Sequence, residues 1–410
     1  MDILLLHPVA TWSLQRIAGV CMRHDWRLTI ITIDNSTVGN GCDGIHEWLR
    51  VPALTDDPIE LRRQIGTRHF DAVVPGNEFA VIGADVLAAE LGLYHNDLRK
   101  IRSSRHKALM RAAFAKAGIA QPEVIARIDS LEACRTFDWS RVTFPVIVKP
   151  VDMAMSLFVR KCDRQHEIEE TLVQMFEFRH SRLTNYPFTA AALIEDYADG
   201  PEYSIEAIIE DGRLVQRFLT QKFVSPLPSC YEVGHISGSD LPPQHAALLD
   251  DICVRIAACW GLLRGVMHVE FKMTDTQVRI IEAGARPAGD HVPELVEACH
   301  GVSFEEAFMR LRAGLPWRET PSSPIQELSR TAKPTDWPSC PTWVGISFGF
   351  PERPATSVAA RAAGLEVLAE CDDPHGALAN ADVWSVNRRT GYVIVRSTSA
   401  DSLADFIAVR

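Results

Sequence analysis

The first 95 residues alternate short apolar runs with stretches whose apolar positions recur at helical spacing. This pattern predicts strands at residues 3–6, 27–33 and 71–74 and helices at residues 13–24, 58–67 and 79–91. Such alternation is typical of a parallel sheet covered by helices. The segments after the first and third strands, at His7 and at Gly76-Asn77-Glu78, should then lie at the carboxyl edge, where such sheets bind ligands.

Beyond residue 100 the pattern changes to longer strands and hairpins. A helix over residues 107–117 is predicted, with Ser103-Ser104 as its N-terminal cap. Strands are predicted at residues 144–149, 157–161, 190–196, 203–209, 213–220, 342–348, 365–370 and 391–396, and further helices at residues 244–260 and 399–409. Residues 224–243 should form a long loop that serves as a lid or binding loop, and the proline-rich residues 319–341 a linker.

Composition narrows the function classes. The net charge of −11, from 42 basic and 53 acidic residues, and the lack of a basic run argue against a nucleic-acid binder. No apolar run approaches the roughly 20 residues that span a bilayer, so no membrane partner is expected. The N-terminus lacks a basic leader and the ten cysteines form no CxxC pair, so a cytoplasmic protein with reduced thiols is expected.

Two acidic residues stand out in a predicted hairpin. Residues 268–273 and 278–282 read as strands joined by a short turn, and a turn centred on Thr276 would place Glu270 opposite Glu282. Like charges at directly opposed positions are destabilising, so a divalent cation is the simplest way to offset them. Hard carboxylate oxygens suit Mg²⁺. The alternative is a solvated face on which Lys272 and Arg279 screen both acids.

The segment after the hairpin adds a cation. Residues 283–289 are small and flexible, and they contain Arg286, four residues after the second acid. A guanidinium beside a metal suits a negatively charged transition state.

A lysine and three acids form a second group upstream. Lys149, one of only eight lysines, closes an apolar strand and needs either an ionic partner or an anionic ligand, unless it merely snorkels at the strand end. Glu195, Glu202 and Glu206 lie on two strands around a Gly-Pro turn. They could hydrogen-bond an amine or ribose hydroxyls, or they could simply protect a sheet edge against aggregation.

In this order and spacing, residues 70–315 resemble the ATP-grasp superfamily. The resemblance implies ATP and Mg²⁺, or Mn²⁺, as cofactors. It implies that Lys107 and Lys149 bind phosphates, that Glu195, Asp196 and Tyr197 form the adenine-binding hinge, that Glu202 binds ribose, that Glu270 and Glu282 ligate the metal, and that Arg286 steadies the transferred phosphoryl group. Residues 151–156 stand where that family has a glycine-rich loop, yet they contain no glycine, and Ser156 could supply a hydroxyl there.

The pattern Glu-x-Gly-x-Arg-x-x-Gly at residues 282–289 resembles the L-amino-acid ligase branch, as do residues 340–410. The implied fold is α/β, with α+β central and C-terminal parts. It comprises a Rossmann-like domain (1–100), a small lid subdomain (101–205), a large subdomain with the metal site (206–320) and a linker with a small C-terminal subdomain (321–410).

The resemblance implies a carboxylate–amine ligase that proceeds through an acyl phosphate and releases ADP. Its partners would be a small carboxylate and an amine, and a homodimer is expected. Substrate contacts are expected from Glu78, Glu232, His235, Gly289 and Arg286, with His268 or His291 as candidate bases. Two alternatives stay open: acylation of a carrier protein or peptide side chain, and a nucleotide-binding scaffold without catalysis.

Overall fold

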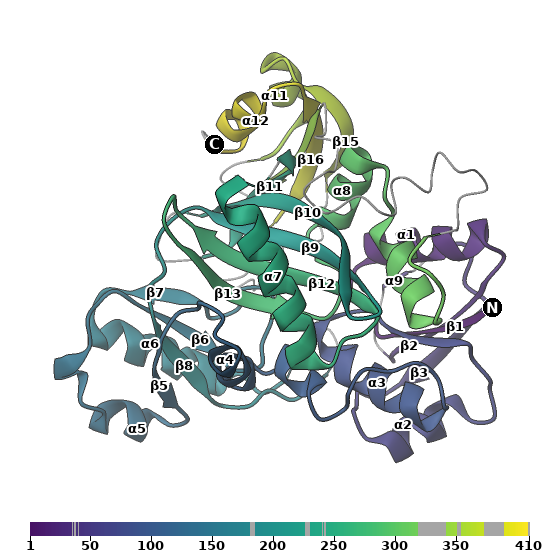
Figure 1. Cartoon of the computed structure of the whole chain (residues 1–410), viewed down its shortest axis with the longest axis horizontal. Coiled ribbons are helices and arrows are strands. Elements are labelled where there is room, and N and C mark those ends of the chain that lie inside the picture. The colour runs from purple at the N-terminus through teal and green to yellow at the C-terminus, as the bar shows by residue number, and fades with distance from the viewer. Residues whose placement is uncertain are drawn as a thin grey trace.

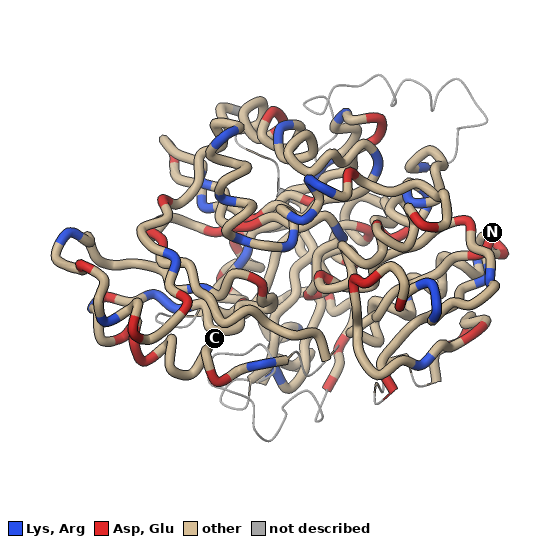
Figure 2. The backbone as a smooth tube through the Cα atoms, turned by 90° about the horizontal axis from the view of Figure 1, so that it is seen from below, with Lys and Arg blue, Asp and Glu red and all other residues tan. Residues whose placement is uncertain are grey.

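The computed structural model describes residues 1–180, 185–225, 230–318, 342–350, 354–372 and 389–408, apart from the single residues 35, 37, 40, 240 and 242. Their strands form three sheets, one in each of three parts of the molecule (Figure 1). Basic and acidic residues are interspersed along the described backbone (Figure 2). No helix among the described residues is long and apolar enough to cross a membrane.

The N-terminal sheet is parallel, as the alternating pattern predicts. Its strand order is β3-β2-β1-β4. The strands are β1 (Asp2–Leu6), β2 (Arg27–Ile33), β3 (Glu47–Val51) and β4 (Ala72–Pro75), and the helices are α1 (Thr11–Arg23), α2 (Pro58–Ile65) and α3 (Val81–Glu90). The edge strand β3 was not predicted, because its half-exposed side chains give no clear apolar pattern. Asn77 lies at the carboxyl edge, where its side-chain amide donates a hydrogen bond to the His7 carbonyl.

A smaller antiparallel sheet follows, in the order β5-β8-β6-β7. Its strands are β5 (Val124–Ile128), β6 (Val146–Pro150), β7 (Arg160–Cys162) and β8 (Ala192–Asp196), and its helices are α5 (Leu131–Thr136) and α6 (Gln165–Glu177). The predicted cap of α4 (Lys107–Lys116) is wrong: the His106 ring nitrogen accepts from the Leu109 amide, whereas both predicted serines lie in a 3₁₀ turn. There each serine hydroxyl donates to a carbonyl three residues back, which leaves neither side chain to cap α4.

The largest sheet has eight strands in the order β13-β12-β9-β10-β11-β14-β16-β15. The strands are β9 (Glu202–Glu210), β10 (Arg213–Val224), β11 (Glu232–Ser239), β12 (Gly265–Met273), β13 (Val278–Gly284), β14 (Trp343–Gly349), β15 (Glu366–Asp372) and β16 (Gly391–Ser397). The helix α7 (Pro243–Trp260) packs against β9 and β10 (Figure 1). The remaining helices are α8 (Val292–His300), α9 (Phe304–Arg312), α11 (Ser357–Ala362) and α12 (Ala400–Ala408).

The predicted loop over residues 224–243 is wrong in part, because it contains strand β11. Gly234, which had indicated a loop, instead permits close strand packing. A Cβ there would lie 2.5 Å from the Ile346 carbonyl oxygen on the neighbouring strand β14. The three predicted C-terminal strands and the final helix are present, whereas the linker 319–341 lies outside the described residues.

Candidate active site

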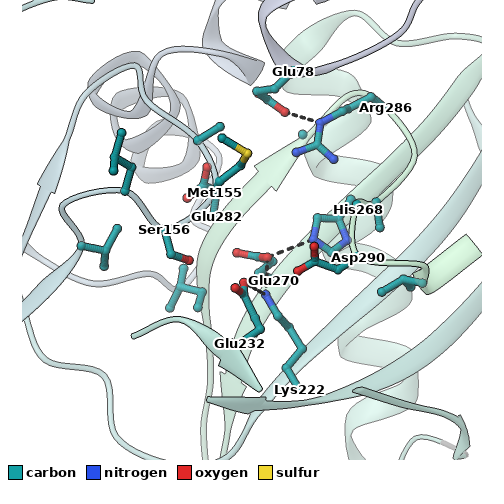
Figure 3. Close-up of a pocket in the computed structure, with 18 of the residues that line it drawn as sticks. Glu78, Met155, Ser156, Lys222, Glu232, His268, Glu270, Glu282, Arg286 and Asp290 are labelled. Atoms are coloured by element: carbon teal, nitrogen blue, oxygen red, sulfur yellow. Dashed lines mark hydrogen bonds and ion pairs between the residues drawn. The ribbon is translucent and has the colours of Figure 1, made fainter. Parts of the chain in front are cut away.

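A cavity of about 680 Å³ lies among the three parts of the molecule (Figure 3). All but two of the residues proposed as functional from the sequence line it. They are Glu78, Lys107, Lys149, Ser156, Glu195, Asp196, Tyr197, Glu202, Glu232, His235, His268, Glu270, Glu282, Arg286 and Gly289. The exceptions are Glu206 and His291. Segments more than 200 residues apart in the sequence therefore converge on one cavity.

The two hairpin carboxylates are opposed as predicted, since Glu270 on β12 pairs with Glu282 on β13. Their repulsion is offset by cations from other elements. Lys107 at the start of α4 lies 2.8 Å from Glu282, whereas Glu270 contacts the Lys222 ammonium and lies 2.9 Å from the His268 ring. Burial would raise the pKa of Glu270, but Lys222 and His268 hold it well below its usual value.

Lys272 and Arg279, the two cations considered as a screen for this carboxylate pair, contact other acids. Lys272 lies 3.3 Å from Glu202, and Arg279 lies 2.7 Å from Asp196. The alternative in which they screen the hairpin acids is therefore wrong.

The donor set of the hairpin fits a hard cation with few protein ligands. Within the described part of the chain, no group of three or more His, Cys, Asp and Glu side chains could hold a metal. The pair Glu270 and Glu282 matches the one or two carboxylates that Mg²⁺ commonly takes from proteins when phosphates and water complete its octahedron.

Lys149 has the ionic partner that its place at a strand end required. Its ammonium lies 2.7 Å from the Glu195 carboxylate and donates to the Ile281 carbonyl at 3.2 Å. Arg111 on α4 holds the same carboxylate at 2.6 Å. Burial lowers the pKa of Lys149 to about 8. The Glu195 side chain is thus committed to two cations, and Asp196 and Tyr197 continue the chain along the cavity wall.

The segment that lacks glycine still adopts glycine-like conformations. Met155 and Ser156 have φ angles of 61° and 52°, in the left-handed region that L-residues rarely adopt. Lys107 donates to the Met153 carbonyl in the same segment at 2.7 Å. Strained backbone of this kind clusters at ligand clamps, and here it borders the cavity.

Lys222 is a cavity residue that sequence reasoning missed. It lies near the end of β10, with its ammonium 3.3 Å from Glu202, 3.2 Å from Glu232 and in contact with Glu270 (Figure 3). Burial would lower the pKa of Lys222, but these carboxylates raise it well above its usual value. The scarcity of lysine was a usable signal, yet the predicted strand ended two residues earlier, at residue 220.

Arg286 forms an ion pair with Glu78 from the N-terminal part of the chain. Its Nε donates to Glu78 at 2.5 Å and its Nη1 donates to the Pro287 carbonyl at 2.7 Å (Figure 3). Burial would raise the pKa of Glu78, but Arg286 keeps it lowered. A Cβ at position 284 would lie 3.0 Å from the Glu78 carboxylate, so Gly284 leaves room for this pair.

The histidines differ in their surroundings. His235 lines the cavity, 3.6 Å from Asp290, but His291 faces a second hollow of about 330 Å³. The structure therefore does not place His291 where a catalytic base would act. Burial would lower the pKa of His268, but Glu206 and Glu270 raise it to about 9. His268 is thus a cation at neutral pH rather than a ready base.

Comparisons with known proteins agree with this geometry. Residues 142–294 match the model of the ATP-grasp domain. The chain is 28% identical to mouse (Mus musculus) carnosine synthase 1 over 125 residues, which is 30% of this chain and 15% of that protein. It is 25% identical to the alanine–anticapsin ligase of Bacillus subtilis over 268 residues, which is 61% of this chain and 55% of that enzyme.

The fold is also that of a solved ligase. The structure of an L-amino acid ligase from Bacillus licheniformis matches with a TM-score of 0.74 and 16% identity, over 99% of this chain and 95% of that one. This likeness establishes the ATP-grasp fold. The chain spans at most about half the length of the curated relatives named above.

Proposed function

Because the chain belongs to the ATP-grasp superfamily, we propose that it is an ATP-dependent carboxylate–amine ligase that forms an amide bond and releases ADP and phosphate. One observation carries the proposal. A single cavity is lined by Lys107 and Lys149, by an opposed carboxylate pair and by an arginine, which are the groups that phosphoryl transfer to a carboxylate requires.

The lysines form the phosphate end of the proposed site. Lys107 and Lys149 contact adjacent residues of strand β13, Glu282 and Ile281, and are both nearly buried, so their charges act in a poorly hydrated region. Mg²⁺ on Glu270 and Glu282 would supply charge neutralisation between the phosphates. When MgATP binds, Lys107 can exchange the Glu282 carboxylate for a phosphate oxygen, since the ion takes over the neutralisation of Glu282.

Arg286 marks the reacting end. A substrate carboxylate oxygen attacks the γ-phosphorus and ADP leaves, giving an acyl phosphate. The amine nitrogen then attacks the acyl carbon, phosphate leaves and the nitrogen loses a proton. Glu78 orients the Arg286 guanidinium through Nε, which aims its remaining donors at negative charge that develops on the phosphoryl group and on the tetrahedral intermediate.

One side of the cavity is apolar and suits the side chain of a substrate. We call it the apolar lobe; it is lined by Val9, Ala10, Trp12, Ile17, Val292, Pro293, Phe308 and Met309. The acid beside it, Glu305, is paired with Arg16 through two hydrogen bonds of 2.5 and 2.9 Å. Because that acid is neutralised, we propose that one co-substrate is an amino acid with an apolar side chain.

Hydroxylamine tests the chemistry without knowledge of the amine. The protein is incubated with MgATP, pooled amino acids and small carboxylates, and hydroxylamine, and both hydroxamate and ADP are measured. Equal amounts of hydroxamate and ADP are expected, with loss of both in Lys149→Ala and retention in Lys116→Ala, an exposed lysine at the end of α4. Formation of AMP instead of ADP would overturn the proposed acyl-phosphate route.

A further inference from the structure

Two consecutive residues at the border of the cavity have strained backbones. Asp290 and His291 have φ angles of 57° and 62°, although neither is glycine. They directly follow Gly289, which lines the cavity, and directly precede α8. A left-handed conformation at two successive L-residues persists only where surrounding contacts hold it. The loop that carries Arg286 therefore ends on a turn that other parts of the chain must stabilise.

Arg389 supplies one of these contacts from the far end of the chain. Its guanidinium donates to both Asp290 carboxylate oxygens, at 2.7 and 2.9 Å, and to the Glu232 carbonyl at 3.2 Å. It also lies 3.5 Å from the centre of the Phe348 ring. The planar fork of arginine matches a carboxylate in this two-bonded geometry, which fixes orientation as well as charge. Burial would raise the pKa of Asp290, but Arg389 holds it well below its usual value.

His291 is held by both terminal parts of the chain. Its ring stacks on Trp12 of the N-terminal domain at 4.2 Å between centroids and lies 4.3 Å from Tyr392 of the C-terminal strand β16. Its Nδ1 is 2.8 Å from Glu294. Arg389 therefore holds Asp290, and the rings of Trp12 and Tyr392 hold His291.

We propose that Arg389 is a positioning residue for the substrate half of the cavity, because it fixes Asp290 and so the loop from Arg286 to Gly289. The kinetic part of this inference rests on the proposed ligase function. Arg389 lies outside the matched ATP-grasp domain, residues 142–294, and does not line the cavity. It acts through two residues that do line it, Asp290 and Glu232. The C-terminal subdomain thereby completes the substrate site.

The kinetic test compares Arg389→Met and Arg389→Lys with Arg396→Met, which removes a half-exposed arginine on β16 that pairs with Glu366. In Arg389→Met, kcat/KM for the acid in the hydroxamate assay should fall at least about tenfold, while the Kd for MgATP stays within about twofold. Arg389→Lys should recover part of the lost kcat/KM, since lysine restores the positive charge but cannot make the two-bonded contact of a guanidinium with a carboxylate. Arg396→Met should resemble the wild type.

A double-mutant cycle tests the route through Asp290. If Arg389 acts by holding Asp290, Asp290→Asn combined with Arg389→Met should be no worse than the more impaired single variant. The inference would be overturned if the losses of kcat/KM in the two single variants multiplied in the double variant. It would also be overturned if kcat/KM of Arg389→Met stayed within about twofold of wild type, or if its affinity for MgATP fell as much as its kcat/KM.

Amide hydrogen exchange provides a readout that needs no activity. Arg389→Met should speed exchange in residues 286–295 at least about tenfold, whereas Arg396→Met should leave that segment unchanged. Absence of hydroxamate in the wild type would contradict the ligase proposal, yet the exchange result would still decide the role of Arg389. Unchanged exchange in residues 286–295 of a folded Arg389→Met protein would show that Arg389 does not hold the loop. If Arg389→Met does not fold, Arg389→Lys undergoes the same measurement, with a smaller increase expected.

Discussion

Lys107 and Glu282 form an ion pair of 2.8 Å between the first turn of α4 and the hairpin strand β13. The pair joins a lysine proposed to bind phosphate to a carboxylate proposed to bind the metal. Each therefore neutralises the other, and Glu270 is neutralised in the same way by Lys222 and His268. Binding of MgATP would replace these internal pairs with contacts to phosphate and to the ion.

Removal of Lys107 should therefore make the folded protein depend on Mg²⁺. In Lys107→Met, Glu282 stays opposite Glu270 without its cation, so the free energy of unfolding should fall by about 1–3 kcal/mol in metal-free buffer. Millimolar Mg²⁺ should then raise Tm more in the variant than in the wild type, because the ion can replace the lost charge. Thermal unfolding with EDTA and with Mg²⁺ measures both effects.

Lys116→Met is the matched control, since that lysine is exposed at the end of the same helix. It should leave both Tm and its Mg²⁺ dependence unchanged. An equal response to Mg²⁺ in Lys107→Met and the wild type would contradict a metal site at these two carboxylates.

The affinity for MgATP should decline in alkaline solution. Burial lowers the pKa of Lys149 to about 8, so its ammonium is present below that pH and is lost as the pH rises through it. Calorimetric titration should give a Kd that increases from about pH 7 to about pH 9.5, with a midpoint above 8 because bound phosphate favours the charged form. Lys149→Arg should flatten the profile, since arginine stays charged. A flat wild-type profile would show that this ammonium does not hold the nucleotide.

His268 should stabilise the fold in a pH-dependent way. Glu206 and Glu270 raise its pKa from 6.5 to about 9 against the opposing effect of burial. Its stabilisation is therefore fully present below pH 6.5 and is lost as the pH rises through about 9. The free energy of unfolding of His268→Gln should be roughly 3 kcal/mol below that of the wild type at about pH 6, and the difference should be much smaller at about pH 10. Urea unfolding measures both values. An increase with pH in the difference in unfolding free energy between wild type and His268→Gln would contradict the charged state of His268.

Sequence patterns were most informative where partners are close along the chain. The Glu270–Glu282 pairing was predicted from a hairpin with a short turn, and it is present. The turn at residues 274–277 alone would place Glu270 opposite Ile281, and a β-bulge between Glu270 and Phe271 shifts the register by one residue to Glu282. The parallel N-terminal sheet followed from its alternating strands and helices for a similar reason. The final strands and helix were also predicted, since each is a run rich in apolar residues.

Partners that lie far apart could not be inferred in this way. Lys222 contacts Glu270 across strand β9, and Arg389 contacts Asp290 from 99 residues away, so only the packed sheet order brings them together. Local rules also failed where tertiary contacts overrode them. The glycines of β11 indicated a loop, although Gly234 serves close packing on β14. The predicted base His291 was misplaced because an isolated histidine carries no information about the face it occupies.

The apolar lobe predicts a change in substrate size preference. Ile17 on α1 is nearly buried and lines the lobe, so Ile17→Phe should fill part of the space that a substrate side chain occupies. Across a series of amino acids from glycine to leucine and phenylalanine, kcat/KM for the large side chains should fall about tenfold or more relative to glycine. Met22→Phe, at an exposed position on the same helix, should leave the series unchanged. Hydroxamate formation measures the preference for the acid substrate. Amide formation with a fixed acid measures the preference for the amine substrate. The assay in which the size preference shifts therefore identifies which co-substrate occupies the apolar lobe. Equal losses for glycine and for phenylalanine in both assays would show that Ile17 supports the fold without contacting a substrate.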